Sequence, residues 1–529
     1  MNSGVATDAR ATGGGLRDWA PVALMAALLL PSLALFPLFD VDEGAFSEAT
    51  REMLASGDWL STTLNGAPRF DKPILIYWLQ AIAVRGFGFN EFALRLPSAL
   101  AGLAWAGAIL AYARPRFGAG TARYAAWIGA TSLGVLAIAH AATADGLLNA
   151  LLAATMFDLW RHLENGQPAP LRRMYAWIGL GILTKGPIAI LVPFAVGFLA
   201  CVLQRDAPWA SRVRRWLRIV GDPVGWVIAL ALAAPWYGYA LAVHGRAFID
   251  GFIMKHNVER FSGTLEGHGG SILYYVVFAP VLLLPWTELL GAALRALRAD
   301  LGQPATRYLW LWCGFVLAFF SLSGTKLPHY ALYGLTPLFV LLARHRDDVR
   351  RPAAALAFPT LLLAIAPAAP WLLQAFAARD TATRARFYAE LAAHALEAAP
   401  TTFYVAAFGA LGIWIALLAT QPAARLRLLA AGAGLCAFVL CYALAPWIGE
   451  VLNGPVKRAG FAARALPEPA VQWNIGAPSF SAYAGRSTPA RAPEPGELAL
   501  TRDDRLPADL DGYRILYREG PIVLLRREK

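Results

Sequence analysis

Charged residues are scarce in this chain. Asp, Glu, Lys and Arg make up 16% of its 529 residues, whereas hydrophobic residues make up 57%. A soluble protein carries roughly a quarter charged residues, so this composition excludes an ordinary soluble globular protein. Several apolar runs approach or exceed about 18 residues, enough for a helix to cross ~30 Å of hydrocarbon. We therefore expect a polytopic membrane protein.

Cysteine is also rare, and its positions exclude a disulfide framework. The four residues are Cys201, Cys313, Cys436 and Cys441, and all stand inside apolar runs. They are expected to be buried small hydrophobic residues and not metal ligands. The chain also shows no internal repeat of fixed period and no heptad array.

The net charge of +12 does not indicate a nucleic-acid partner. The arginines cluster in short loops between apolar runs, which is typical of cytoplasmic loops. The most basic of these loops holds Arg205, Arg212, Arg214, Arg215 and Arg218. These residues need no function beyond setting the topology.

The apolar runs predict an all-α transmembrane domain of about 13 spans over residues 1–447, with a first, uncleaved span at 19–38. Large outer loops are expected at 39–73 and 244–270. The short apolar segment 74–87 is predicted to be a shallow or re-entrant helix, because the arginines that follow it look cytoplasmic.

Two regions outside the spans predict structure of their own. Residues 43–55 carry apolar side chains four apart with charges between them, which predicts an amphipathic helix in the membrane interface, ended by Gly57. Residues 448–529 are rich in charge, Pro and Gly and predict a small α/β or β-rich outer domain. Its runs 513–517 and 522–525 predict two strands.

Polar groups are concentrated in five outer segments beside apolar spans, where unpaired charges are costly. They are Asp40/Asp42/Glu43, Asp71/Lys72, Thr143/Asp145, Lys255/His256/Asn257/Glu259/Arg260 and Lys326/His329/Tyr330, with Lys185 as a sixth candidate. Together they predict one outer site for an amphipathic, phosphorylated substrate, meaning a lipid phosphate.

The adjacent carboxylates Asp42 and Glu43 repel each other, so a cation or metal is expected to hold one while the other acts as a base. The alternative is that both only favour the N-terminus of a helix. Asp145 has the same alternative role. Asp71 can cap a helix that starts at Pro73, which leaves the Lys72 ammonium to bind a phosphate.

His256 is either a solvated surface residue or a metal ligand together with Asp71, since imidazole and carboxylate suit a divalent ion. Arg260 lies four residues further on and is expected to clamp phosphate oxygens. Lys326 and Tyr330 belong either to this phosphate site or to an interfacial belt.

The motifs that contain these residues resemble those of a known family. They are Asp42-Glu43, the run from Glu48 to Trp59, Leu64-Asn65-Gly66, Asp71-Lys72-Pro73 with Tyr77-Trp78, Thr143-Ala144-Asp145, Leu183-Thr184-Lys185-Gly186-Pro187, the run from His256 to Phe261, and the run from Lys326 to Tyr330. In this order they resemble the bacterial membrane glycosyltransferases of the aminoarabinose (lipid A) transferase and protein O-mannosyltransferase-like family.

The resemblance implies a GT-C fold with a periplasmic C-terminal domain, in a monomeric protein of the bacterial inner membrane. It implies a polyprenyl-phosphate sugar donor and a lipid (lipid A-like) or other cell-envelope acceptor. The roles it implies are catalytic for Asp42, Glu43 and Asp145, donor phosphate binding for Lys72, Arg260, Lys326 and Tyr330, and binding of a divalent metal (Zn or Mg/Mn) for Asp71 and His256.

Two departures from the family pattern bear on the metal site (Asp71) and on the substrates (Gly44 to Ser47). The family often has Glu where this chain has Asp71, and an Arg-Tyr-Ala-type run where this chain has Gly44-Ala45-Phe46-Ser47. The alternative function is a lipid or polyprenyl-linked sugar transporter without transferase chemistry. Transporters often consist of repeated halves with polar groups at broken helices near the midplane, and this sequence shows no such halves.

Overall fold

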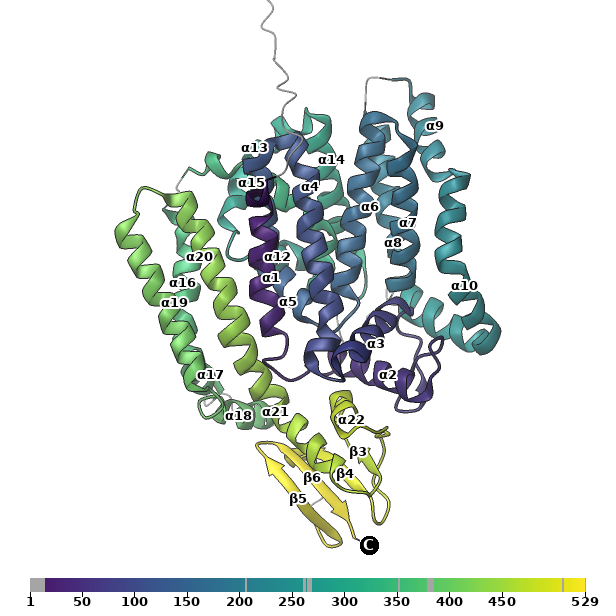
Figure 1. The fold of residues 1–529 in the computed structure, drawn as a ribbon, viewed down its shortest axis with the longest axis vertical. Helices are drawn as coiled ribbons and strands as arrows, with labels where there is room; N and C mark the ends of the chain where they lie inside the picture. Colours follow the sequence, from purple (N-terminus) through teal and green to yellow (C-terminus); the bar gives the residue numbers. More distant parts are fainter. Residues whose placement is uncertain are drawn as a thin grey trace, which may run out of the picture.

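The computed structural model describes residues 15–204, 207–259, 263, 269–350, 353–377, 385–506 and 509–528. These residues form a bundle of helices with a small mixed sheet at one end (Figure 1). The predicted site residue Arg260 lies outside the described residues.

The N-terminal half of the chain supplies helices on both sides of the first outer loop. They are α1 (Ala20–Ser32), α2 (Asp42–Ser56), α3 (Leu75–Phe87), α4 (Glu91–Thr131), α5 (Leu133–His140), α6 (Asp145–Asn165), α7 (Pro168–Lys185), α8 (Ile188–Val202), α9 (Trp209–Val220) and α10 (Pro223–Phe248). The loop between α2 and α3 contains a two-residue hairpin of β1 (Thr63–Leu64) and β2 (Ala67–Pro68).

The C-terminal half continues the bundle. Its elements are η2 (Ile249–Glu259), α12 (Tyr274–Leu282), α13 (Glu288–Leu301), α14 (Pro304–Leu322), η3 (Pro328–Ala331), α15 (Leu332–Arg344), α16 (Ala357–Ile365), α17 (Ala369–Ala377), α18 (Ala385–Ala393), α19 (Thr401–Thr420), α20 (Arg425–Val439), η7 (Leu440–Leu444) and α21 (Ala445–Arg464).

Six helical stretches among the described residues are long and apolar enough to cross a membrane. They are Glu91–Thr131, Trp209–His256, Pro304–Leu322, Ala354–Phe376, Thr401–Thr420 and Arg425–Arg464. The first contains a bend at Gly118, whose φ of 81° breaks the helix into two rods. The fold is the expected helical membrane fold, and the exact number of about 13 spans stays a prediction.

The short helix α3 has only 13 residues, or about 20 Å of helix, against ~30 Å of hydrocarbon. It lies beside α2 at the lower end of the bundle, next to the C-terminal domain (Figure 1). This agrees with the prediction that the segment does not cross the membrane.

The predicted helix after the first span is α2, and it ends at Gly57 with a φ of 73° as expected. Its expected place in the membrane interface is wrong, because every side chain from Glu43 to Thr50 is buried. The helix packs between α3 and α22 (Pro478–Ala484) of the C-terminal domain. Protein, and not lipid, therefore covers it.

The C-terminal domain has a four-stranded sheet in the order β3 (Ala470–Gln472), β4 (Leu498–Arg502), β6 (Ile522–Arg527), β5 (Tyr513–Glu519). The predicted pair of strands is the antiparallel hairpin β5–β6. Side chains of β6 alternate between two clusters, since Ile522 and Leu524 face α21 and α22 while Leu525 packs with Val471. Both faces of the strand are thus covered, which explains its unbroken apolar run.

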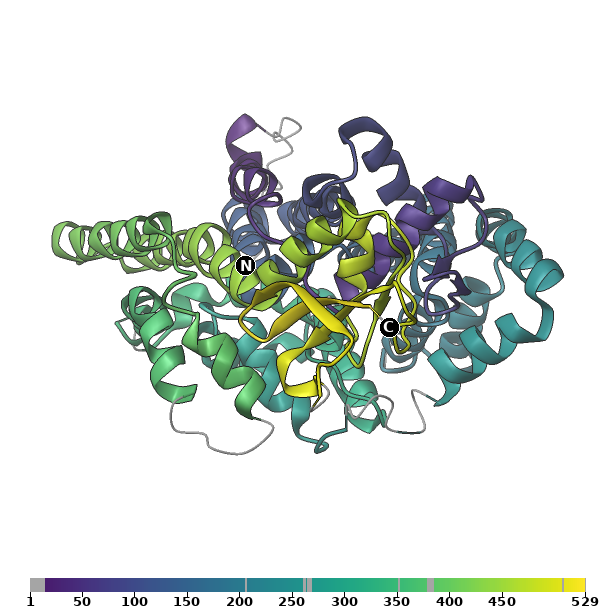
Figure 2. The ribbon, with the colours of Figure 1, turned by 90° about the horizontal axis from the view of Figure 1, so that it is seen from below.

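The predicted boundary between residues 447 and 448 falls inside α21. The helical stretch Arg425–Arg464 continues from the bundle into the C-terminal domain. Seen from below, this domain lies over the middle of the lower end of the bundle (Figure 2). The domain therefore faces the loop that carries the predicted site.

Candidate active site

A large polar cavity lies at the lower end of the bundle, where the first outer loop meets α6, α7, η2 and η3. Its empty volume is about 1700 Å³, including the part open to solvent. The predicted residues that line it are Asp42, Asp71, Lys72, Asp145, His256 and Tyr330, and it is also lined by Arg69, Thr143, Lys185 and His329. The fold thus brings together groups from all five predicted segments and the sixth candidate, Lys185.

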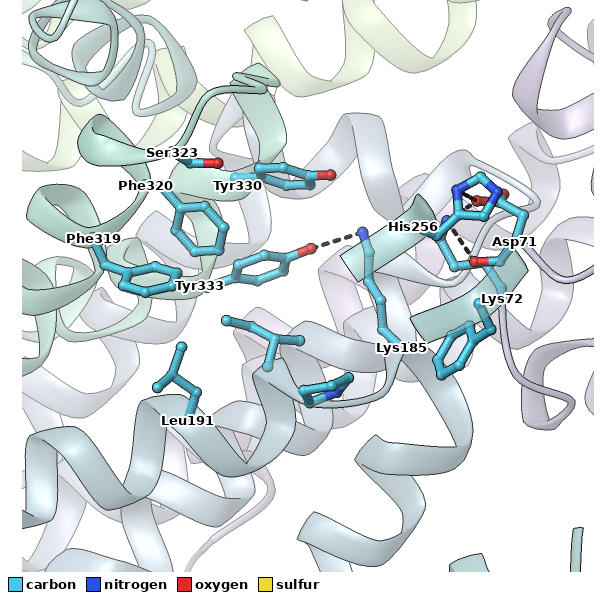
Figure 3. Close-up of a pocket in the computed structure, with 13 residues that line it drawn as sticks. Asp71, Lys72, Lys185, Leu191, His256, Phe319, Phe320, Ser323, Tyr330 and Tyr333 are labelled. Atoms are coloured by element: carbon cyan, nitrogen blue, oxygen red, sulfur yellow. Dashed lines mark hydrogen bonds and ion pairs between the residues drawn. The ribbon is translucent and has the colours of Figure 1, made fainter. Parts of the chain in front are cut away.

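A second cavity of about 850 Å³ adjoins the first and shares Lys72, Lys185, His256 and Tyr330 with it. Figure 3 shows its two sides, with the rings of Phe319, Phe320, Tyr330 and Tyr333 on one side and the charged groups of Asp71, Lys72 and His256 on the other. A third cavity of about 1090 Å³ shares Asp42 and Asp145 with the polar one and is walled mainly by apolar side chains, such as Phe36 and Leu440. The polar cavity therefore lies between two largely apolar ones.

Glu43 does not line the polar cavity; its carboxylate is engaged by α4. Arg95 donates from Nε to Oε1 at 2.9 Å and from Nη2 to Oε2 at 2.7 Å. The backbone N–H groups of Phe39 and Ala142 donate to the same carboxylate. The Arg95 guanidinium is fully buried and also donates to the carbonyls of Leu33, Phe36 and Pro37. This network fixes the chain between α1 and α2.

Asp42, in contrast, is exposed to the polar cavity. Partial removal from water inside the cavity raises the pKa of Asp42, the charge of Asp145 acts in the same direction, and Lys72 opposes it. The expectation that a cation holds one carboxylate of the pair while the other is available fits this geometry. Glu43 is the one that is held, and Asp42 is the one available to a substrate.

Asp71 is surrounded by three cationic or potentially cationic groups. Lys72 Nζ donates to Oδ1 at 2.7 Å, Arg69 Nη2 donates to Oδ2 at 3.0 Å, and His256 Nδ1 lies 3.1 Å from Oδ1 (Figure 3). Burial alone would raise the pKa of Asp71, but the charges of Lys72, Arg69 and His256 outweigh it and hold the pKa well below its usual range. Asp71 is therefore a carboxylate that anchors two cations at the cavity wall.

Asp145 lies at the start of α6 and has a similar set of partners. Lys185 Nζ donates to Oδ1 at 2.5 Å, the Tyr333 hydroxyl donates to it at 2.9 Å, and His329 Nε2 lies 3.5 Å from it. Lys185 also donates to the Tyr333 hydroxyl and lies 5.1 Å from the centre of the Tyr330 ring. Asp145 thus positions Lys185 more than it acts as a free base.

The predicted metal pair is brought together, since Asp71 and His256 are in contact. Among the described residues, however, no group of three or more His, Cys, Asp or Glu side chains could hold a metal ion. A zinc site usually needs at least three protein ligands, and Arg69 and Lys72 already balance the charge of Asp71. The described side chains alone do not make a complete metal site.

The remaining predicted residues differ in position. Tyr330 lines both cavities and its ring stacks on Tyr333 at 5.9 Å. Lys326 is buried, donates to the Ser323 carbonyl at 2.6 Å, and is not among the described residues that line the cavities. Arg260 lies outside the described residues, so its expected role stays a prediction.

Three contributors were not predicted from the sequence: Arg69, Arg95 and Tyr333. Arg95 lies in the long apolar helix α4, Tyr333 lies at the start of the short helix α15, and Arg69 lies in the loop before Asp71. The only available signal was that a charge within an apolar span, such as Arg95, needs a partner.

Sequence comparison relates this chain to known sugar transferases. The family model for dolichyl-phosphate-mannose-protein mannosyltransferases matches residues 71–239. The chain is 33% identical over 360 residues to an undecaprenyl phosphate-alpha-4-amino-4-deoxy-L-arabinose arabinosyl transferase of Aeromonas salmonicida, covering 65% of this chain and 62% of that protein. The corresponding protein of Pseudomonas paraeruginosa is 31% identical over 351 residues, covering 63% of this chain and 61% of that protein.

A solved structure matches nearly the whole fold. The crystal structure of ArnT from Cupriavidus metallidurans bound to undecaprenyl phosphate has a TM-score of 0.77 and 22% sequence identity, covering 96% of this chain and 97% of that one. Residues 71–239 therefore resemble that mannosyltransferase family, and the chain has the fold of the ArnT structure. The predicted helical GT-C fold is confirmed.

The sequence matches span less than two thirds of the length of these two relatives. The six long apolar helices among the described residues indicate a multi-pass membrane protein. The polar cavity lies within the matched fold. The residues that line this cavity are the basis of the function that we propose.

Proposed function

We propose that the protein is an inner-membrane glycosyltransferase that moves a sugar from a polyprenyl-phosphate donor to a lipid (lipid A-like) or other cell-envelope acceptor. The observation that carries this proposal is the polar cavity, which holds an available carboxylate, Asp42, beside two anchored cations, Lys72 and Lys185. A polyprenyl-phosphate sugar has the matching parts: an anionic phosphate, a polar sugar and an apolar tail.

The donor phosphate is proposed to lie between Lys72, Lys185 and Arg69. Asp71 and Asp145 hold these cations in place, so little reorganisation is needed when negative charge develops on the leaving phosphate. The adjoining cavity with the rings of Phe319 and Phe320 is suited to the first isoprene units of the tail. The apolar cavity on the other side of Asp42 is suited to the acceptor lipid.

In the proposed reaction an acceptor oxygen attacks the anomeric carbon, and the bond from that carbon to the phosphate oxygen breaks. Asp42 takes the proton of an acceptor hydroxyl, or orients the acceptor where the attacking group is already a phosphate. Its raised pKa makes it a stronger base than an ordinary carboxylate. Attack from the face opposite the leaving polyprenyl phosphate inverts the anomeric configuration. The site and the C-terminal domain are proposed to face the periplasm, since the arginine-rich loops lie at the opposite end.

The related proteins support this proposal, because they are named as transferases that use undecaprenyl phosphate-linked 4-amino-4-deoxy-L-arabinose. The run from Gly44 to Ser47 departs from the family pattern, so the sugar and acceptor are to be identified by direct measurement.

The test is transfer of radiolabelled sugar in membranes from undecaprenyl-phosphate-linked donors, followed by separation of lipid A, other glycans and protein. Label is expected in one acceptor fraction with the wild type and to be absent with Asp42→Asn. Asp250→Asn is the matched control, because Asp250 is exposed on η2 and pairs only with Arg246 among the described residues. Full turnover by a folded Asp42→Asn protein would contradict the role of Asp42. Donor flipping in liposomes without transfer would favour a transporter instead.

A further inference from the structure

A separate cavity lies at the arginine-rich end of the bundle, far from the site described above. It has about 880 Å³ of empty volume, including its open mouth, and lies where α6, α8, α9 and α14 approach one another. Its lining includes Arg215, Arg307, Glu164, Trp160 and Leu311. The cavity lies between the ends of these helices that are at the top of Figure 1.

The helix α6 sets the distance between the two sites. Asp145, in the polar cavity, is its first residue, and Glu164, in this second cavity, is near its last. A helix of this length measures about 30 Å, which equals the hydrocarbon thickness of a bilayer. The two cavities therefore lie at opposite ends of α6, about one bilayer thickness apart.

The charge of this cavity is positive on balance. Arg215 donates to the Leu163 carbonyl and to Gln204 Oε1 at 3.0 Å, which are neutral acceptors, and no described carboxylate pairs with it. Arg307 donates only to the Leu301 carbonyl, at 3.5 Å, among the described residues. The one carboxylate in the described lining, Glu164, is paired with Arg116.

The helix α9 places Arg215 at this cavity and carries the features of an interfacial helix. Trp216 packs on Phe198 at 5.2 Å and donates to the Phe194 carbonyl at 3.0 Å, so α9 is anchored to α8. Trp209, Leu217 and Arg214 are exposed on the same helix. Exposed Trp and Arg side chains on one amphipathic helix are typical of a helix at the lipid–water boundary.

We propose that this cavity binds the headgroup of an anionic phospholipid from the leaflet opposite the active site. The phosphate would lie between Arg215 and Arg307, and the upper acyl chain would lie against Leu311 and the ring of Trp160. Basic pockets between membrane helices commonly take anionic lipid headgroups, and the volume is that of a small-ligand site. This site does not depend on the proposed transferase activity.

The test is titration of the purified full-length protein with phosphatidylglycerol or phosphatidylcholine, with bound lipid measured by native mass spectrometry. Phosphatidylglycerol is expected to bind more tightly. Arg215→Gln and Arg307→Gln should each lower its apparent affinity about fivefold, and Arg214→Gln, on the same helix but outside the cavity lining, should leave it nearly unchanged. Ala200→Phe should block binding while both arginines remain, because Ala200 lines the cavity.

Three results would overturn the proposal. Equal affinity for the two lipids would exclude headgroup recognition. Equal losses in Arg214→Gln and Arg215→Gln would show diffuse attraction to α9 instead of a cavity. Displacement of phosphatidylglycerol by inorganic phosphate at equal affinity would reveal a small-anion site. Arg307→Gln and Ala200→Phe lie on different helices from Arg215, so the test does not depend on one variant folding.

Discussion

Ser479 of the C-terminal domain binds the carboxylate of Asp40, two residues before Asp42. Its backbone N–H donates to Oδ1 at 2.9 Å and its hydroxyl donates to Oδ2. The two backbone segments approach so closely that a Cβ on Gly44 would lie 2.4 Å from the Ser479 nitrogen. Gly44 is therefore required for this contact, and the C-terminal domain directly positions the start of α2.

This contact predicts a pH dependence of stability. Burial raises the pKa of Asp40 to about 7, against the opposing hydrogen bonds from Ser479, and burial raises the pKa of Glu48 to about 7 in the same helix region. Both values exceed those of the unfolded chain, so the native state binds more protons between about pH 4 and 7. The stabilisation from these two groups is therefore complete below about pH 4 and is lost as the pH rises from 4 through 7.

The measurement is thermal unfolding in detergent from pH 5 to 8. Asp40→Asn keeps an acceptor oxygen for the Ser479 N–H, and its amide NH2 can donate to the Ser479 hydroxyl. It should remove roughly half of the slope, since two groups share it. Asp40→Asn together with Glu48→Gln should remove most of it. An unchanged slope in the double variant would show that other groups cause the dependence.

A second prediction separates Glu43 from Asp42. Arg95→Met leaves the buried Glu43 charge without its partner and should cost about 3–5 kcal/mol of the free energy of unfolding. Arg95→Met combined with Glu43→Gln should recover part of that loss. Lys457→Met, which breaks the more exposed pair with Glu91, should cost much less.

Thermal or denaturant unfolding measures these differences, and transfer activity is measured on the same samples. A Glu43→Gln protein with wild-type stability and no turnover would contradict the structural role and restore the predicted catalytic role of Glu43.

A third prediction concerns the cations of the cavity. Lys72→Met and Lys185→Met each remove one charge from the proposed phosphate site, and each should lower kcat about a hundredfold. Lys255→Met is the matched control, because Lys255 is exposed on η2 and does not line the cavity among the described residues. Steady-state kinetics with varied donor measure the effect. A loss equal to that of the Lys255 control would contradict the assignment.

The divalent metal remains a prediction with its own test. Elemental mass spectrometry measures the metal content of the purified protein, and the wild type is compared with His256→Asn. Stoichiometric metal in the wild type that disappears in the variant would support binding by Asp71 and His256. A metal-free, active wild type would contradict metal binding, and Asp71 would then be held by Arg69, Lys72 and His256 among the described residues.

The local features of this fold were predictable from the sequence. The spacing in residues 43–55 and Gly57 gave α2 and its end, and the alternation after Tyr513 gave the hairpin β5–β6. Such features depend on neighbours along the chain, where period and turn residues carry the signal.

Long-range pairs were not predictable in the same way. Arg95 and Glu43 are 52 residues apart and Asp145 and Tyr333 are 188 residues apart, so no local pattern joins them. Family resemblance predicted that Asp71 and His256 share a site. No motif in the sequence indicated the salt bridge between Arg69 and Asp71. Helix α22 packs on α2, so a helix whose sequence pattern indicated a lipid-facing surface is buried in the protein.

The unbroken helical stretch from Arg425 to Arg464 has a consequence for protein engineering. A cut at residue 448 would fall within this helix and would separate Ser479 from Asp40, Lys457 from Glu91 and Ser481 from Asn65. The C-terminal domain is thus not a modular appendage. A working chimera between two such proteins has to exchange the first outer loop and the C-terminal domain as a pair.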